Sequence, residues 1–460
     1  MLFNSLSFLA SFAALTIVYY LLPHRFRWVL LAAASLGFYA LFNPGGVLLL
    51  LGVTLVAYAG GLAIGGSTGR SNRNAFLTAS ASLVLAALVC SKVSSSFFNS
   101  FATSVGVSFY TFSCISYLAD VHGRRLAAER HVGYFTLYVS FFPKLLAGPI
   151  ERARPFLTQV RQVVVFNDAG MTVGLQLMLW GLFKKVVIAD RLAPFVDRAY
   201  GQAAFASPAD LLLATYFFAF QLYCDFSGYS DIAIGAAKVL GFDLMENFRR
   251  PYLARSVPEF WARRWHLSLT SWFRDYVYIP LGGNRVSRTR QSFNVMVVFL
   301  LSGAWHGANW TFVVWGGLNG AYVVASLMTS GLRQRSSGGR PAAPSGVFRG
   351  LLTFHLVLVT WVFFRAATLA DATTILSRIA SSLGRLPALI IARVAAGEVV
   401  LSLLLIAVLL VVEWLDETRP VWQRLGARPV HVRWAAYYAM LLCLVVLGAW
   451  NLQQFVYMQF

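Results

Sequence analysis

Residues 293–315 read FNVMVVFLLSGAWHGANWTFVVW. This apolar run is typical of a helical membrane protein, and a single histidine interrupts it. The interruption is Trp305-His306-Gly307-Ala308-Asn309-Trp310. Basic residues lie before the run at 285–290 and after it at 333–340, so both ends are predicted to face the same side of a membrane. About 14 helical residues separate the first basic end from the histidine, which corresponds to about 21 Å of helix. The sequence therefore predicts that His306 lies deep in the bilayer.

A histidine at that depth has two interpretations. Holding an ionisable group there costs a few kcal/mol or more, so such a residue is usually retained for a function. A neutral imidazole could deprotonate an alcohol and make it a nucleophile for an acyl group. It could equally be hydrogen-bonded inside a helical bundle without a catalytic role. Trp305 and Asn309 lie beside His306, and Asn309 offers a polar partner, so both are predicted to support it.

The composition indicates that the whole chain is a membrane protein. Of its 460 residues, 58% are hydrophobic and 12% are charged, whereas soluble domains carry about 25% charged residues. Apolar runs long enough to cross a hydrocarbon core of about 30 Å recur from end to end. We therefore expect one all-α polytopic domain over residues 1–460, with about eleven transmembrane helices and a histidine-bearing core at 241–330. The first apolar run, 2–22, lacks a basic segment and a cleavage site, which predicts a retained helix.

The net charge of +20 raises the question of nucleic acid as a partner, because basic patches neutralise phosphates. In a membrane protein, however, arginines concentrate in cytosolic loops that face anionic lipid. The loops at 23–28, 65–74 and 120–132 hold seven arginines, whereas the turns between them hold only Lys92 as a basic residue. This asymmetry predicts an N-terminus outside the cytosol, membrane lipids as partners of the basic loops, and no nucleic-acid binding.

Two segments interrupt the helical pattern. Residues 141–150, FFPKLLAGPI, contain two prolines and a glycine and are followed by arginines at 152–161, which predicts a re-entrant or interfacial piece. A second break is predicted at 225–231, DFSGYSD. Its two carboxylates could form an acid–base pair or bind a metal. The simpler interpretation is helix caps with one buried, hydrogen-bonded aspartate.

Residues 259–269, EFWARRWHLSL, carry the other histidine of interest, His266. Trp261, Trp265 and Trp272 recur at spacings of four and seven, which predicts one helical face. Such a stripe is typical of interfacial anchoring or packing. His266 could orient or polarise a carbonyl group, or it could be a structural hydrogen-bond donor. Asp275, further along the segment, is a supporting candidate.

Nine arginines lie between residues 241 and 290. A solvated cytosolic face accounts for them. They could also dock an acidic acyl donor, because guanidinium groups pair bidentately with phosphates. The docking candidates are Arg263, Arg264 and Arg274, and the donor would be a coenzyme A thioester or an acidic carrier protein.

The sequence gives little support to other chemistries. The four cysteines lie in apolar runs without Cys-x-x-Cys spacing, so we expect neither a disulfide framework nor a metal site. No Walker loop and no His-Glu-x-x-His pattern occurs. Paired internal symmetry, which would favour a transporter, is not evident.

The chain resembles the membrane-bound O-acyltransferase family, most closely the bacterial branch that includes the alginate O-acetylation membrane protein and the D-alanyl transfer protein of teichoic acids. The resemblance rests on an ordered series of motifs rather than on any one of them. Besides the two histidine segments, the motifs are SVGVSFYTF (104–112), FPKLLAGPI (142–150), GLFKK (181–185), YCDFSGYSD (223–231) and FVYMQF (455–460).

The resemblance implies a helical shell around a thinned centre, with a tunnel through which an acyl group crosses. It implies His306 as the family's hallmark catalytic histidine and His266 as the second catalytic position. The implied activity is O-acetylation of an exopolysaccharide such as alginate or cellulose at the bacterial inner membrane. An extracytoplasmic polysaccharide acetyltransferase subunit would be the partner. Acetyl-CoA or an acyl carrier protein would be the donor, as a substrate rather than a bound cofactor.

Several alternatives stay open at this point. The acyl or D-alanyl group could go to another envelope polymer, a protein or a lipid. A transporter or scaffold without bond chemistry would use the basic loops for docking alone. At the C-terminus, Tyr457 could carry the acyl group before a partner takes it, or it could anchor the chain at the membrane interface together with Phe455 and Phe460.

Overall fold

The structure is a computed structural model that describes residues 3–97, 106–307, 309–335, 346–395, 397 and 399–450. Within these ranges every regular element is a helix. Helices are expected of such apolar segments, because a helix satisfies its own backbone N–H and C=O groups where water is absent. The predicted all-α class is confirmed for the part of the chain described.

Among the described residues, seven helices are long and apolar enough to cross a membrane, so the chain is a multi-pass membrane protein. An eighth span is formed if two helices bent by 98° count as one, and α1 is apolar but only 16 residues long. The sequence predicts about eleven. The candidates found among the described residues are His24–Phe42, Pro44–Gly66, Arg70–Lys92, Asp168–Gly201, Trp310–Thr329, Gly346–Arg365 and Val430–Leu447, with Leu369–Ser381 and Leu386–Ala395 as the bent pair.

Contacts divide the chain into two compact units. The first contains the described residues up to Leu182 together with Gly228–Glu246. The second contains Phe183–Ser227 and the described residues from Asn247 onward. Candidate spans occur in both units.

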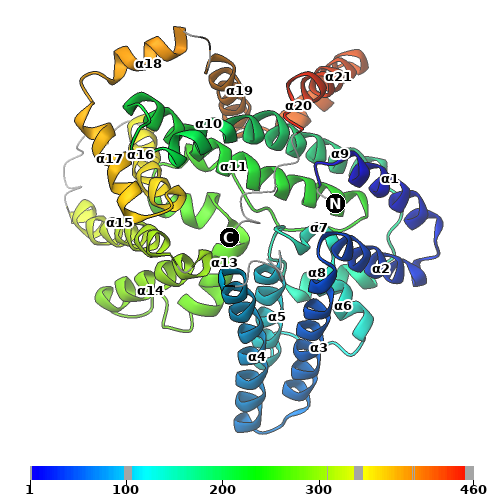
Figure 1. The fold of residues 1–460 in the computed structure, drawn as a ribbon. Helices are drawn as coiled ribbons and strands as arrows, with labels where there is room; N and C mark the ends of the chain where they lie inside the picture. Colours follow the sequence, from blue (N-terminus) through cyan, green and yellow to red (C-terminus); the bar gives the residue numbers. More distant parts are fainter. Residues whose placement is uncertain are drawn as a thin grey trace. The chain divides into compact units, whose positions relative to one another are not determined.

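The described residues of the first unit form nine helices that lie wholly within it. In it α3 and α4 pack against each other and against α5, as three neighbouring rods (Figure 1). The helices are α1 (Leu6–Leu21), α2 (His24–Phe42), α3 (Pro44–Gly66), α4 (Arg70–Phe97), α5 (Val107–His122), α6 (Val132–Ser140), α7 (Phe142–Leu145), α8 (Ala153–Arg161) and α9 (Asp168–Leu182).

The predicted interruption at 141–150 is present in the first unit. The chain breaks between α6 and the four-residue α7, and it then runs without regular structure to α8. Tyr138 holds the two sides of this break together, because its hydroxyl donates to the carbonyl oxygens of Ser113 at 3.1 Å and Glu151 at 3.0 Å. The buried hydroxyl thus gives the Glu151 carbonyl, which lies outside any helix, a hydrogen-bond partner and links it to α5.

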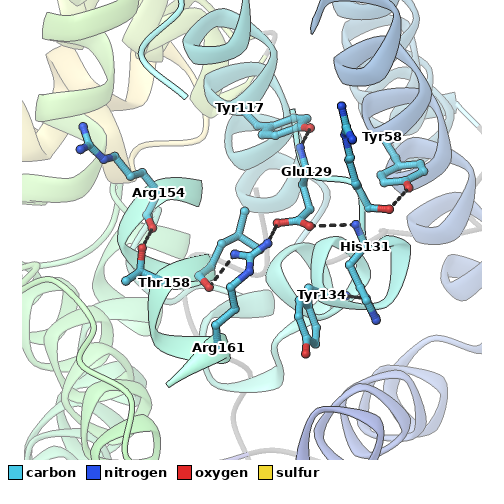
Figure 2. Close-up of polar contacts among 10 residues, drawn as sticks. Tyr58, Tyr117, Glu129, His131, Tyr134, Arg154, Thr158 and Arg161 are labelled. Atoms are coloured by element: carbon cyan, nitrogen blue, oxygen red, sulfur yellow. Dashed lines mark hydrogen bonds and ion pairs between the residues drawn. The ribbon is translucent and has the colours of Figure 1, made fainter. Parts of the chain in front are cut away.

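A polar cluster around Glu129 fixes the loop that precedes α6 (Figure 2). The Glu129 carboxylate accepts from the His131 N–H at 2.8 Å and pairs with the Arg161 guanidinium, while the Glu129 N–H donates to the Tyr117 hydroxyl at 3.0 Å. Tyr58 of α3 donates to the carbonyl oxygen of Arg130 at 2.6 Å. The cluster thereby ties α3, α5 and α8 to one loop.

The second unit contains the segments that bear the two histidines. Its elements are η1 (Phe183–Ala189), α10 (Asp190–Gly201), η2 (Pro251–Leu253), α12 (Val257–Glu259), η3 (Phe260–Arg264), α13 (Leu267–Phe273), η4 (Arg274–Tyr278), α14 (Arg288–His306), α15 (Trp310–Arg335), α16 (Gly346–Arg365), α17 (Leu369–Ser381), α18 (Leu386–Ala395), α19 (Val400–Asp416), α20 (Val421–Gly426) and α21 (Val430–Leu447).

One long helix, α11 (Pro208–Val239), contributes to both units and corrects a prediction. The sequence predicts a break with helix caps at 225–231, but the helix runs through that segment without interruption. The predicted buried aspartate is present, since Asp225 is 2% exposed and pairs with Lys185 at 2.7 Å. Because this carboxylate has a cationic partner, it does not need a helix end to satisfy it.

Candidate functional site

His306 is the last residue of α14, and α15 begins at Trp310, so the two helices form the predicted hairpin with the histidine at its tip. They lie side by side (Figure 1). Glycines allow this close approach. The Cα of Gly316 lies 3.6 Å from where a Cβ on Gly303 would be, and the carbonyl oxygen of Phe312 lies even closer to that point. Small residues at helix crossings are common in membrane proteins because packing, rather than hydrophobicity, holds the helices together.

The His306 side chain sits in an aromatic pocket. The residue is 4% exposed. Its ring centroid lies 4.5 Å from that of Trp305, 4.9 Å from Phe364, 5.0 Å from Trp315 and 6.0 Å from Phe312. Three helices of the second unit, α14, α15 and α16, therefore fix the position of this imidazole.

The segment around His266 differs from the predicted single helix. Trp265 is extended, and His266 has a left-handed backbone with φ 46°, so the chain breaks between η3 and α13. The prediction that Trp261, Trp265 and Trp272 share one helical face is therefore wrong. A left-handed histidine is uncommon and costs about 1–3 kcal/mol, so the surrounding structure has to hold it.

Asn247 provides that support. Its carbonyl oxygen accepts from the Leu267 N–H at 2.9 Å, and its side-chain oxygen accepts from the Ser268 hydroxyl at 2.9 Å and the Ser268 N–H at 3.3 Å. The start of α13 is thus tied to a buried asparagine 20 residues earlier. Strained backbone of this kind tends to occur at functional sites.

His266 and His306 are brought together through Trp305. The His266 ring centroid lies 4.6 Å from Phe226 and 6.4 Å from Trp305, and Trp305 also contacts His306. His266 is 2% exposed and lies outside the candidate spans. Burial lowers its pKa well below the ordinary value, so the imidazole is neutral at physiological pH.

Four tryptophans continue this aromatic cluster. The ring of Trp361 lies 5.0 Å from Trp265 and 6.1 Å from Trp315, and Trp261 lies 5.5 Å from Trp315. The Trp261 N–H donates to the side-chain oxygen of Asn319 at 3.0 Å. Packing within the protein, one of the two roles considered for the tryptophan stripe, therefore describes Trp261 and Trp265.

The other predicted supporting residues are engaged with the protein itself. The Asn309 amide donates to the carbonyl oxygen of Ala367 at 2.7 Å, and its oxygen accepts from the Thr311 N–H at 3.1 Å. Asn309 thus caps the start of α15. The Asp275 carboxylate pairs with Arg274 at 2.8 Å.

The three arginines proposed for donor docking differ in their surroundings. Arg264 pairs with Glu259 at 2.7 Å and with Glu417, and its side chain is 15% exposed. It therefore cross-links the protein. Arg263 is exposed, and the Arg274 side chain is 62% exposed despite its pairing with Asp275. Arg263 and Arg274 are thus more accessible to an external anion than Arg264 is.

The two lysines of the GLFKK motif form buried polar contacts that the sequence analysis did not predict. Lys185 lies 2.8 Å from Asp190 and 2.7 Å from Asp225, and none of the three side chains is more than 3% exposed. Lys184 donates to the Ser227 hydroxyl at 2.9 Å. Both lysines lie in η1, a wide helical turn of the kind that often marks functional sites. The sequence feature that could have indicated these buried contacts is a pair of adjacent lysines within an apolar run.

The proposed acyl-carrying residue at the C-terminus, Tyr457, lies outside the described residues. The same holds for the rest of the FVYMQF motif at 455–460.

Comparison with known proteins gives one family match. Residues 75–367, which include His266 and His306, match MBOAT, the membrane-bound O-acyltransferase family. The match extends over both structural units.

The curated relatives described next align with 46% to 80% of the chain. It is 38% identical over 397 residues to the probable alginate O-acetylase AlgI of Azotobacter vinelandii, which covers 80% of this chain and 76% of that protein. It is 36% identical over 298 residues to the peptidoglycan O-acetyltransferase of Helicobacter pylori, covering 59% and 56%. It is 25% identical over 223 residues to the teichoic acid D-alanyltransferase of Bacillus subtilis, covering 46% and 56%.

Proposed function

Because the chain belongs to the membrane-bound O-acyltransferase family, we propose that it moves an acetyl group from a cytosolic thioester across the membrane to an exopolysaccharide of the alginate or cellulose type. The chain is an O-acyltransferase by family. The observation that supports this substrate class is the 38% identity, over 80% of the chain, to a protein named as an alginate O-acetylase.

In this proposal His306 is the general base. It takes the proton of an acceptor hydroxyl, whose oxygen then attacks the thioester carbon. The thiolate that leaves takes up that proton, so the transfer consumes no other reactant. His266, neutral and joined to His306 through Trp305, orients the reacting groups. What supports the pairing is that both imidazoles are buried and contact the same indole ring.

The donor is acetyl-CoA or an acyl carrier protein, which docks from the cytosol. Arg263 and Arg274 are the docking residues that we propose, since both are exposed. Arg264 is removed from that set because Glu259 and Glu417 already neutralise it.

The rest of the proposed arrangement rests on membership of the family, and the orientation of the N-terminus rests on the charge asymmetry of the loops. We place the chain in the bacterial inner membrane as an MBOAT fold of about eleven spans around a central tunnel, with the N-terminus outside. An extracytoplasmic acetyltransferase subunit then receives the acetyl group, and Tyr457 is the residue that we propose to carry it there. Mass spectrometry of the C-terminal peptide after incubation with donor tests that step. An unmodified Tyr457, or full activity in Tyr457→Phe, would contradict it.

The central experiment is His306→Ala, with His431→Ala, an exposed histidine, as the matched control. We expect polymer-bound acetyl ester to disappear in the first variant and to persist in the second, while both proteins accumulate in the membrane. Ester content near normal in His306→Ala would refute the assignment.

Peptidoglycan is a second candidate acceptor, favoured by the 36% identity to the Helicobacter pylori peptidoglycan O-acetyltransferase. Ester analysis of both polymers in a deletion strain separates the two. If acetate were lost from peptidoglycan alone, peptidoglycan rather than the exopolysaccharide would be the acceptor.

A further inference from the structure

Two indole N–H groups near His306 have no hydrogen-bond acceptor among the residues that the structure describes. They belong to Trp315, which is 2% exposed, and Trp361, which is fully buried. Leaving a buried donor unpaired costs about 1–3 kcal/mol, so native proteins rarely do so without a reason. A ligand that supplies an acceptor would remove that cost.

Trp315 is the better placed of the two. Its ring centroid lies 5.0 Å from that of His306, with the two planes at 88°. Its backbone carbonyl accepts from the Asn319 amide at 2.9 Å, and Asn319 in turn accepts from the Trp261 N–H. The Trp315 ring is also packed against Phe364 at 5.4 Å. The indole is therefore held in one position, as a preorganised donor must be.

Acyl transfer needs a donor at this place. When an alcohol oxygen attacks a thioester, the electron pair of the C=O bond moves onto the carbonyl oxygen, which becomes negative. When the intermediate collapses, that pair re-forms the C=O bond and the C–S bond breaks. An N–H aimed at the oxygen in a dry site lowers the barrier, and the donor nitrogen has to lie about 2.7–3.1 Å from the place where that oxygen becomes negative.

We propose that the Trp315 N–H donates a hydrogen bond to the acyl carbonyl oxygen of the thioester and stabilises the negative charge that develops there. This rests on the proposed role of His306 as the base. Trp315 is then a catalytic residue of the transfer step. Trp361, whose ring packs against Trp315 and Trp265, is assigned to packing around it.

The test removes the N–H while keeping the shape of the side chain. Trp315 is replaced by 3-benzothienylalanine, in which sulfur stands in place of the N–H group, and by phenylalanine as a second variant. The same analogue at Trp361 is the matched buried control, and at Trp414, which is 67% exposed, it is the surface control. Membrane vesicles that contain the full-length protein together with the proposed extracytoplasmic subunit are assayed with acetyl-CoA and a soluble polysaccharide acceptor, alongside His306→Ala.

We expect the Trp315 analogue to lower kcat by about 10²-fold, the typical loss when one such donor is removed, with KM for the donor nearly unchanged. The Trp361 and Trp414 analogues should retain kcat within about threefold. A Trp315 analogue with kcat near wild type, beside an inactive His306→Ala, would overturn this inference and leave the proposed function intact. Equal losses at Trp315 and Trp361 would also overturn it, because they would indicate packing. An active His306→Ala would instead remove the base on which both proposals depend.

Discussion

The crossing of α14 and α15 offers a direct test of how the position of His306 depends on helix packing. Gly303 lies one helical turn before His306 on α14. A Cβ added at Gly303 would lie 2.4 Å from the carbonyl oxygen of Phe312 on α15. That oxygen belongs to the backbone, so it cannot rotate away as a side chain would. We therefore expect Gly303→Ala to push the two helices apart.

The size of the displacement follows from these distances. Real Cβ atoms essentially never come within 3.0 Å of such an atom, so the gap has to grow from 2.4 Å to at least 3.0 Å. Because His306 is only three residues further along, most of this shift of roughly half an ångström reaches the imidazole. A misplacement of about 1 Å can cost about 10²-fold in rate. We expect a loss of about tenfold in kcat, with a stability cost of about 1–3 kcal/mol from overpacking.

The matched control is Gly317→Ala on the facing helix α15, where the nearest atom to an added Cβ is the Leu300 Cδ2 at 4.0 Å. Gly316→Ala should reproduce the effect, since its Cβ would meet the Phe299 carbonyl oxygen. Initial rates at saturating donor give kcat, and fluorescence-detected size-exclusion chromatography after heating reports stability. If Gly303→Ala and Gly317→Ala have the same kcat within twofold, helix separation does not control the site and the reasoning fails.

Two further predictions concern charged side chains. Lys185→Met leaves Asp190 and Asp225 buried without their cation and should lose about 3–5 kcal/mol of stability in detergent. Adding Asp225→Asn should recover part of that loss. The control Lys238→Met breaks an exposed ion pair and should cost no more than about 1 kcal/mol. Arg264→Gln should lower thermal stability without a specific effect on the KM for the donor. Arg263→Gln should instead raise the KM for the donor and weaken its salt dependence without changing stability. If Arg264→Gln raised the KM and Arg263→Gln lowered stability, the wrong arginine would have been placed at the donor site.

Features with a local cause could be predicted from the sequence. The hairpin of α14 and α15 follows from a long apolar run with basic residues at both ends, and its tip at His306 follows from where that run is interrupted. The irregular segment at 141–150 follows from its prolines, which cannot continue a helix. Each of these signals lies within about 25 residues of the structure that it specifies.

Features that depend on distant residues could not be predicted in this way. The helical spacing of Trp261 and Trp265 is real, but the helix breaks at His266 because Asn247 hydrogen-bonds to Leu267 and Ser268 instead. Nothing in the segment itself favours a left-handed histidine over a helical one.

Arg264 gives a second example. Its local sequence resembles that of Arg263, yet only Arg264 meets Glu417, which lies 153 residues away. A basic segment predicts an electropositive face, but it does not tell which guanidinium groups are already neutralised within the fold.

The ion pair between Lys185 and Asp225 has a consequence for biosynthesis. Asp225 is made 40 residues after Lys185, so the segment leaves the ribosome with two buried lysines, Lys184 and Lys185, and only one buried carboxylate, Asp190, to offset them. We expect this segment to remain next to the insertion machinery until α11 follows, and the two to enter lipid together. A photo-crosslinker placed in η1 should then react with the insertion machinery in nascent chains truncated before Asp225, and with lipid in chains extended beyond α11. Equal crosslinking to lipid in both would show that the segment enters the bilayer without Asp225.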